Sequence, residues 1–353
     1  GGVLPHPTGT FTAGVFKGTT PTRSTNSEIS ERFAALRSIT LAENGTMSHR
    51  FTNIFWQGTQ PGYFHVTPDG ASSSEIHLGA NHEPLIYYTL RALLYDVCAN
   101  ARARVIDVGA SVGHFALYMA AMGCSVTAVE ANPKFTWFLN MSTIVNGFDN
   151  SQLKVWLRLA GDAGANKQVW VKGLEFHTQQ AAGATPLMVY EDNLARITHS
   201  EWGAQETCRV IKIDIEGMEL ITLESMQRDA LWCDTYVVEW SPVKWSTYGF
   251  ANATTRGAKV MNAFVAHGYA LGLTTNTGLN FARAGGRLKA WGQMPAYKMV
   301  STEAAPITLA SNDATFSGQC GVRCDMIITR DPRAFAMLQG PAGSLLAIVK
   351  HSV

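Results

Sequence analysis

The 353-residue chain has few charged residues, no excess of either sign and no long apolar run. Charged residues make up 16% of it and the formal net charge is +1 without a long basic segment, so the basic footprint typical of nucleic-acid binding is missing. No apolar stretch reaches the roughly 18 residues that a membrane-spanning helix needs. We therefore expect no nucleic-acid partner and no membrane contact within this chain. The 46% of hydrophobic residues are ample for a folded core.

Motifs typical of metal sites and of dinucleotide sites are also missing. The six cysteines include no Cys-x-x-Cys pair, which argues against a zinc site. The ten histidines show no metal-ligand spacing either. No Gly-x-Gly-x-x-Gly fingerprint of a dinucleotide site occurs in the segment where it would be expected, Val105–Phe115, because Ser111 stands where the second glycine is required.

That segment is nevertheless the most informative one. A short β-branched run ends in Asp-x-Gly-x-x-x-Gly, formed by Asp107, Gly109 and Gly113, and passes into a helical pattern. The pattern predicts a buried parallel strand, a tight glycine loop that lets a ligand touch the backbone, and a helix whose amino end faces that ligand. A ligand without a pyrophosphate suits this loop, and S-adenosylmethionine is the first candidate. Ser111 is included among the expected cofactor contacts.

A second acidic residue supports a nucleoside ligand. The next predicted strand, 125–130, ends in Glu130, and an acid at the tip of the second strand holds ribose hydroxyls in nucleotide-binding doubly wound folds. The alternative is a surface glutamate that caps the following helix.

Strand and helix patterns alternate through the middle of the chain, which is typical of an α/β fold with a largely parallel sheet. Strands are expected at 105–109, 125–130, 153–158, 210–214, 236–240, 269–274 and 325–330, with a possible extra strand at 168–172 and a hairpin from 50–56 and 63–66. Helices are expected at 28–42, 83–99, 113–122, 133–146, 218–227 and 254–267. We divide the chain into a flexible arm or stem (1–26), an N-terminal extension (27–80) and a catalytic domain (81–353). Residues 276–322 are weakly periodic and are interpreted as an acceptor-side insertion.

Three segments together resemble the FkbM family of S-adenosylmethionine-dependent methyltransferases. They are Asp107–Gly113, the stretch Glu130–Pro133, and the sequence Lys-Ile-Asp-Ile-Glu-Gly-Met-Glu that ends at Glu219. Ala131 departs mildly from the proline that the family often has. The resemblance spans roughly residues 80–330, and its third motif is the specific one.

The resemblance implies a Rossmann-like class I methyltransferase fold, with a mostly parallel seven-stranded sheet and helices on both faces. It also implies O-methylation, often of sugar hydroxyls, with Asn132 and Asp162 added to the cofactor contacts. Asp162 follows the third strand, where class I enzymes contact adenine, although a plain turn aspartate is equally expected. In the class I order the strands that begin near Cys208 and Cys233 are neighbours, so a disulfide between them is possible. Cys320 and Cys324 are a second candidate pair, and the alternative is that all six cysteines are reduced.

Charged residues mark the expected reaction cleft. Lys212, Asp214 and Glu216 alternate with isoleucines, which predicts that the three share one face of a central strand. Charges on a central strand are costly unless they are paired or functional, and ligands bind at the carboxyl ends of such strands. We therefore expect Asp214 and Glu216 to face the cleft, and Lys212 to be a buried counter-ion for a neighbouring carboxylate.

Methyl transfer to a hydroxyl requires removal of its proton. Asp214 is the first candidate for the base or acceptor-orienting group, Glu239 at the end of the adjacent strand is the second, and Glu216 completes the predicted catalytic set. The alternative for Glu239 is a purely structural role as a helix cap or a salt-bridge partner. A divalent metal on Asp214 and Glu239 is an alternative, because oxygen ligands suit magnesium, but no third ligand is identifiable and no metal is expected.

These observations predict an S-adenosylmethionine-dependent O-methyltransferase acting on a sugar or glycan hydroxyl. The alternatives are an RNA ribose, small-molecule or lipid O-methyltransferase of the same fold, and, less favoured, a dinucleotide-dependent oxidoreductase or a non-catalytic binding module. Asn-x-Ser/Thr sequons at Asn44, Asn140 and Asn252, together with the cysteines, favour the secretory pathway or Golgi lumen over the cytoplasm. The sequence leaves the acceptor and the oligomeric state open.

Overall fold

The computed structural model describes the core of the chain and parts of its extensions. The described residues are 53–57, 61–67, 84–172, 175–177, 180, 182–203, 207–240, 245, 250–274, 297–301 and 324–334. The expected arm over 1–26, the expected helix over 28–42 and Cys320 lie outside them, as does most of the segment 276–322.

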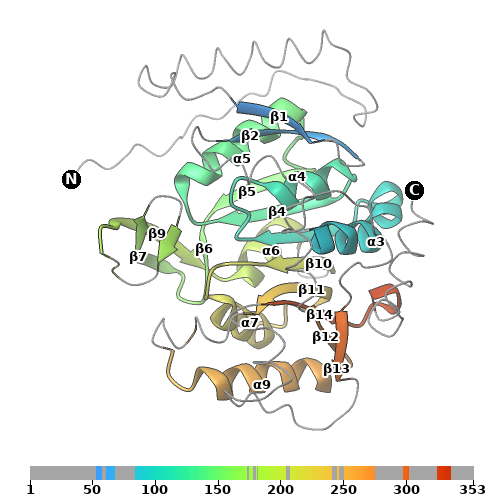
Figure 1. The fold of residues 1–353 in the computed structure, drawn as a ribbon, viewed down its shortest axis with the longest axis vertical. Coiled ribbons are helices and arrows are strands. Elements are labelled where there is room, and N and C mark those ends of the chain that lie inside the picture. Colours follow the sequence, from blue (N-terminus) through green and yellow to red (C-terminus); the bar gives the residue numbers. More distant parts are fainter. Residues whose placement is uncertain are drawn as a thin grey trace, which may run out of the picture.

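An eight-stranded sheet forms the centre of the molecule, in the order β13-β12-β14-β11-β10-β3-β4-β5 (Figure 1). Its strands are β3 (Arg104–Val108), β4 (Ser125–Glu130), β5 (Leu153–Leu157), β10 (Cys208–Ile213), β11 (Cys233–Trp240), β12 (Ala270–Thr274), β13 (Tyr297–Ser301) and β14 (Cys324–Thr329). The five strands from β5 to β11 in this order are parallel, and β14 runs antiparallel to both of its neighbours.

The chain leaves β3 toward β4 and β5 on one side and later returns to build β10 and β11 on the other. This reversal places a topological switch point between β3 and β10, where ligands bind in open α/β sheets. The expected Rossmann-like class I order is confirmed. The sheet has an eighth strand, β13, because residues 297–301 pair with β12 at the edge, within the segment whose weak periodicity predicted no strand.

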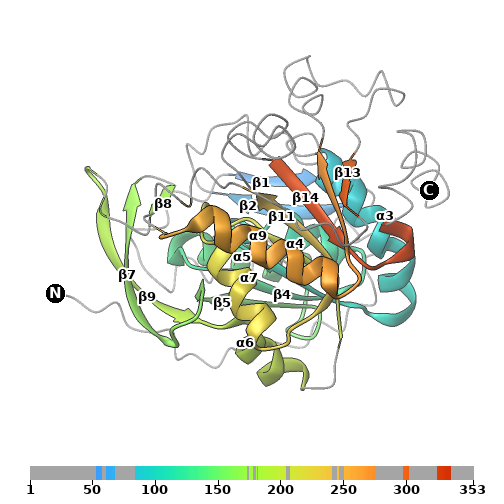
Figure 2. The same ribbon diagram turned by 90° about the horizontal axis from the view of Figure 1, so that it is seen from below.

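Helices cover both faces of the sheet (Figures 1 and 2). One face carries α3 (Pro84–Ala101), α4 (His114–Ala121) and α5 (Pro133–Asn146), and the other carries α6 (Leu194–Trp202), α7 (Glu219–Arg228) and α9 (Ala253–Ala266). Successive strand residues alternate between two hydrophobic cores, so that Val105 packs with α3 and α4 while Ile106 and Val108 pack toward α6, α7 and α9. The helix α6 was not predicted; Asn193 caps it by accepting a hydrogen bond from the amide of Ala195 at 2.7 Å.

Two further β units flank the core. The expected N-terminal hairpin, β1 (Asn53–Gln57) and β2 (Tyr63–Thr67), is antiparallel, and β2 is held on α5 by hydrogen bonds from the amide of Phe64 to Asn146 and from the amide of Val66 to Ser142. A second sheet has the order β6-β9-β7-β8 and extends beside the core in Figure 1. Its strands are β6 (Leu159–Ala160), β7 (Ala165–Lys172), β8 (Glu175–His177) and β9 (Thr185–Asp192). Only part of β7 was expected from the sequence.

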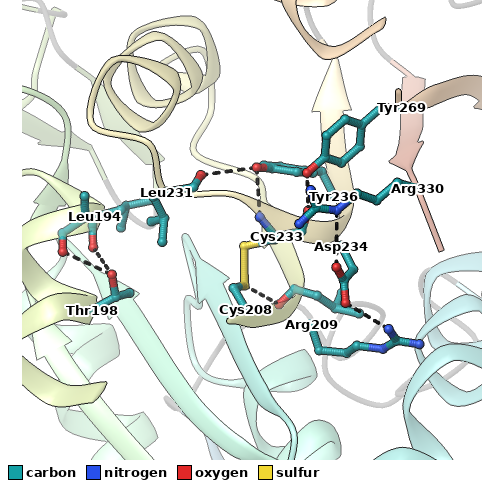
Figure 3. The surroundings of a disulfide bond; sticks show 12 residues. Leu194, Thr198, Cys208, Arg209, Leu231, Cys233, Asp234, Tyr236, Tyr269 and Arg330 are labelled. Carbon is teal, nitrogen blue, oxygen red and sulfur yellow. Dashed lines mark hydrogen bonds and ion pairs between the residues drawn. A yellow bond between two sulfur atoms is a disulfide. The ribbon is translucent and has the colours of Figure 1, made fainter. Parts of the chain in front are cut away.

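Two disulfides lie at the amino ends of the strands. Cys208 and Cys233 are directly opposite each other in the parallel register of β10 and β11, with Cα atoms 4.4 Å apart, and they are bonded as the class I order suggested (Figure 3). Arg209 and Asp234, the next residues on the two strands, form an ion pair at 2.8 Å. The second bridge, Cys98–Cys124, joins the last turn of α3 to the residue before β4 and was not predicted.

None of the helices in the described part of the chain combines the length and apolar character that a bilayer crossing requires.

Candidate functional site

The glycine loop after β3 lies at the switch point of the sheet. Gly109 and Gly113 have φ values of 76° and 103°, and Ser111 between them also has a positive φ of 51°. The amides of Gly109 and Ala110 donate to the carbonyl of Val129 on the neighbouring strand β4, and α4 begins at His114. The loop therefore turns tightly and presents the amino end of α4 at the carboxyl edge of the sheet, as predicted.

The two glycines are required by the protein's own packing. A Cβ atom at Gly109 would stand 1.8 Å from the carbonyl oxygen of Asp214, and one at Gly113 would stand 2.3 Å from Cδ1 of Leu139 on α5. The sequence predicts that these glycines allow a tight turn and let a ligand touch the backbone. The protein atoms that approach the two positions belong to the turn after β10 and to α5, and contact with a ligand stays a prediction.

The side chain of Glu130 is hydrogen-bonded to the glycine loop. Its Oε2 accepts a hydrogen bond from the amide of Ser111 at 2.7 Å, and its Oε1 accepts one from the amide of Asn132 at 2.7 Å. The side chain is 8% exposed, and burial raises its pKa to about 7 although the amide hydrogen bonds act in the opposite direction. Each carboxylate oxygen retains acceptor capacity beyond one amide, so the group can still receive ribose hydroxyls.

The other two expected cofactor contacts have defined partners in the protein. Asn132 is buried and caps α5 by accepting from the amide of Lys134 at 2.9 Å. Asp162 is exposed, and both of its carboxylate oxygens pair with the guanidinium of Arg228, which holds the pKa of Asp162 below its usual range. A contact between Asp162 and adenine stays a prediction, and it would have to be made alongside this ion pair.

A row of charges crosses the α4 face of the sheet. Lys212 lies directly opposite Asp107 in the register of β10 and β3, with Nζ 4.0 Å from Oδ1 of Asp107 and 3.2 Å from Oδ2 of Asp214. The same ammonium lies 4.8 Å from the ring centre of Phe115, the second residue of α4. Lys212 is 4% exposed, so this arrangement confirms it as a buried counter-ion.

The expected sharing of one strand face by Lys212, Asp214 and Glu216 is wrong for Glu216. The strand β10 ends at Ile213, and Glu216 has a φ of 54° in the turn that precedes α7. The period-two alternation therefore stops before it reaches Glu216. The turn nonetheless returns the side chain to the same place, because carboxylate oxygens of Asp214, Glu216 and Glu239 all lie within 4.8 Å of one another.

These three carboxylates can act in two ways. Glu239 is buried near the end of β11, Asp214 is partly exposed and Glu216 is exposed. The group of carboxylates therefore extends from the protein interior to the solvent. Two ligands on opposite sides of one calcium ion are about 4.8 Å apart, and oxygen-only sets of this kind suit magnesium or calcium. If a cation binds here, Glu216 would be the third oxygen ligand, which was not identifiable from the sequence. Without a cation the same carboxylates are available as proton acceptors.

Glu219, singled out from the sequence only as part of a motif, is hydrogen-bonded to this turn. It is fully buried and accepts hydrogen bonds from the amides of Ile215 and Gly217. Burial raises its pKa above the ordinary range. The sequence signal that could have identified it is an acid in the first turn of a helix, where the helix dipole favours negative charge.

The chain is similar in fold to solved methyltransferases. A SAM-dependent methyltransferase from Agrobacterium tumefaciens is 12% identical, with 78% of this chain and 70% of that chain covered and a TM-score of 0.39. An O-methyltransferase from Bacillus cereus in complex with SAH is 12% identical, with 72% and 86% covered and a TM-score of 0.34. Human methyltransferase-like protein 13 in complex with SAH is 11% identical, with 76% and 92% covered and a TM-score of 0.36.

No protein-family model and no curated protein matches the chain. The fold is defined by the strand order of the central sheet.

Proposed function

We propose that this chain is an S-adenosylmethionine-dependent O-methyltransferase whose acceptor is a sugar or glycan hydroxyl. The observation that carries the proposal is the junction of the glycine loop with Glu130, made by the hydrogen bond from the amide of Ser111. The carboxylate of Glu130, the amino end of α4 and a group of three further carboxylates lie at the carboxyl ends of neighbouring strands of the sheet. The FkbM-like motifs described above support the same class.

Glu130 and the glycine loop are the proposed cofactor contacts. The carboxylate of Glu130 would receive the ribose hydroxyls, and the amino end of α4 would face the carboxylate of the methionine moiety. When bound, the cofactor would supply an electrophilic methyl group, whose bond to sulfur would break as the acceptor oxygen bonds to the methyl carbon, with S-adenosylhomocysteine as the leaving group. The chain's own residues have to position the acceptor and take its proton.

Asp214 is the proposed proton acceptor. It lies at the carboxyl end of β10, partly exposed, beside Glu239 and Glu216. The ammonium of Lys212 lies 3.2 Å from its Oδ2. Glu239 would orient the acceptor, and Glu216, which is exposed, would bind a second hydroxyl of a polyol. If a divalent cation occupies the group, these residues take ligand roles instead.

A second candidate is an RNA ribose hydroxyl. The contact between Lys212 and Asp214, with Glu239 nearby, supplies part of the lysine and acid set that RNA ribose methyltransferases use. The net charge of +1 favours the glycan over the RNA.

We also propose that the protein works in the secretory pathway. The two disulfides, Cys98–Cys124 and Cys208–Cys233, support an oxidising compartment.

The test is incubation of the full chain with isotopically labelled S-adenosylmethionine and a panel of glycans, with structured and single-stranded RNA as the rival arm. Mass spectrometry should find one labelled methyl group on a glycan hydroxyl and none on RNA. Label on RNA ribose alone would replace the glycan proposal with its rival. Label on nitrogen, or titrations showing tight binding of NAD and none of S-adenosylhomocysteine, would overturn the O-methyltransferase proposal.

A further inference from the structure

The turn between β10 and α7 carries two of the three clustered carboxylates in an unusual backbone shape. Glu216 has a φ of 54° and Gly217 a φ of 108°, so two successive residues have positive φ. A positive φ is costly for a residue with a side chain, and such a conformation persists only where the surroundings hold it. The group that holds it here is the side chain of Glu219.

Glu219 is hydrogen-bonded to the turn on both sides of Glu216. Its Oε1 accepts hydrogen bonds from the amide of Ile215 at 3.2 Å and from the amide of Gly217 at 2.9 Å. Its Oε2 accepts a hydrogen bond from the indole Nε1 of Trp245 at 3.2 Å. The carboxylate is 0% exposed and lies in the first turn of α7. Burying a carboxylate is costly, and three hydrogen bonds with a helix amino end offset that cost.

These contacts join the turn to a second element of the fold. Trp245 is fully buried and packs edge-to-face on Trp240, the residue after Glu239, with ring centres 4.5 Å apart. Glu219 therefore connects the turn that bears Asp214 and Glu216 to the end of β11 that bears Glu239. The carboxylate oxygens of these three residues lie within 4.8 Å of one another.

We propose that Glu219 is a positioning residue, which fixes the turn of residues 214–218 so that the carboxylates of Asp214 and Glu216 meet that of Glu239. The inference rests on the proposed function for its catalytic consequence, while its structural content concerns the turn alone. A simple helix cap would stabilise α7 without affecting the two residues on either side of Glu216.

The chemistry of a glutamine at this position provides the test. In Glu219→Gln the amide oxygen can still accept from Ile215 and Gly217, but the amide nitrogen then faces the indole N–H of Trp245, and two donors oppose each other. Trp245→Phe removes the opposing donor. The double variant Glu219→Gln/Trp245→Phe should therefore recover what the single variant loses, with Trp245→Phe alone as the matched control.

Two measurements are made on the full chain below the unfolding temperature of every variant. Amide hydrogen exchange at Ile215 and Gly217 reports the turn without reference to activity, and methyl transfer with saturating acceptor reports its consequence. Glu219→Gln should speed exchange at both amides and lower kcat at least about tenfold, the scale expected from a small misplacement of reacting groups. Its Kd for S-adenosylhomocysteine should stay within about threefold, because the substitution alters the hydrogen bond to Trp245 and leaves in place those that Glu130 accepts from Ser111 and Asn132. The double variant should return kcat to within about threefold of Trp245→Phe.

Unchanged exchange at Ile215 and Gly217 in Glu219→Gln would overturn the proposal, and so would a fall in kcat matched by an equal loss of S-adenosylhomocysteine affinity. If Glu219→Gln does not fold, the double variant is compared directly with Trp245→Phe, and a difference in exchange confined to other parts of the chain would refute the positioning role. If wild-type protein methylates no acceptor, the proposed function fails, and the exchange result still decides whether Glu219 holds the turn.

Discussion

Gly109 and Asp214 approach each other so closely that no side chain fits between them. A Cβ at Gly109 would lie 1.8 Å from the carbonyl oxygen of Asp214, and the amide of Asp214 donates to the carbonyl of Val108 at 3.0 Å. The loop proposed to hold the cofactor and the turn proposed to hold the base are thus one packed unit at the switch point. Through this contact the backbone would fix the spacing between the proposed cofactor and the proposed proton acceptor.

Gly109→Ala should therefore destabilise the protein and disturb both the proposed cofactor loop and the turn that bears Asp214. Gly183→Ala is the matched control, because Gly183 also has a φ of 76° but a Cβ there would meet nothing within 4 Å. The control carries only the cost of positive φ, about 1–2 kcal/mol. Gly109→Ala should cost at least about 2 kcal/mol more, because backbone has to move. Urea unfolding of the two variants measures the difference, and equal losses would show that the contact with Asp214 is unimportant.

The affinity for S-adenosylhomocysteine should depend on pH through Glu130. The pKa of Glu130 is raised to about 7, and ribose hydroxyls donate preferentially to the ionised carboxylate. Between about pH 6 and pH 8 the ionised fraction rises from roughly a tenth to nine tenths, so affinity should rise about tenfold. Calorimetric titration measures this, with Glu130→Gln expected to remove the slope and NAD expected not to bind. Glu130→Ala should weaken binding by about 1–3 kcal/mol. A flat pH profile in wild-type protein would place the ribose elsewhere.

Ionisation of Glu130 should also affect stability: as pH rises, the free energy of unfolding should fall, whereas the affinity for S-adenosylhomocysteine should rise. The folded chain holds a proton on Glu130 at pH values where the unfolded chain has lost it, since the folded pKa is about 7 and the ordinary value is 4.5. The unfolding free energy should therefore decline as pH rises from 4.5 to about 7 and then level off. Denaturant unfolding of wild type and Glu130→Gln across this range isolates the effect as their difference. A difference that grows in favour of wild type with rising pH would contradict the burial of this group.

Asp214→Asn should separate chemistry from cofactor binding. Turnover should fall by about 10²-fold or more, the usual scale of general-base loss, while affinity for S-adenosylhomocysteine stays within a few-fold. Glu239→Gln should fall less if Glu239 only orients the acceptor. Near-normal turnover of Asp214→Asn with saturating acceptor would show that the base lies elsewhere.

Metal dependence is decided in the same assays. Wild-type turnover that is abolished by a chelator and restored by magnesium would assign Asp214, Glu216 and Glu239 as ligands of a cation. Turnover that is insensitive to the chelator keeps Asp214 as the proton acceptor.

Both disulfides should be found in protein secreted from a eukaryotic host. Non-reducing peptide mapping should link Cys98 to Cys124 and Cys208 to Cys233. Replacing either pair by serine should lower the unfolding free energy by about 2–4 kcal/mol, the usual contribution of a bridge that closes a loop of this size. Free thiols at Cys208 and Cys233 in such material would refute the bridge and remove support for a secretory location.

Local sequence determined the elements that carry the site. Asn132, Pro133 and Gly147 bound α5 because a cap, a helix-initiating proline and a left-handed terminal glycine act within a few residues, and the helix spans the predicted 133–146. Likewise the β-branched runs that end at Asp107 and Glu130 predicted two strands, because a buried parallel strand needs only apolar side chains on both faces. The order of the strands followed from the FkbM-like motifs, and the neighbouring positions of Cys208 and Cys233 followed from that order.

Only the tertiary structure decided which distant groups meet. Glu216 joins Asp214 and Glu239 because Glu219 and Trp245 hold a turn with positive φ, and alternation along a strand cannot foresee a turn. Cys98 is bonded to Cys124 because the end of α3 lies beside the start of β4, and no local sequence pattern predicts this contact. Gly109 is a glycine because another segment's carbonyl comes within reach of it. A sequence specifies how each segment prefers to fold, whereas the distance between two segments is set by all the packing between them.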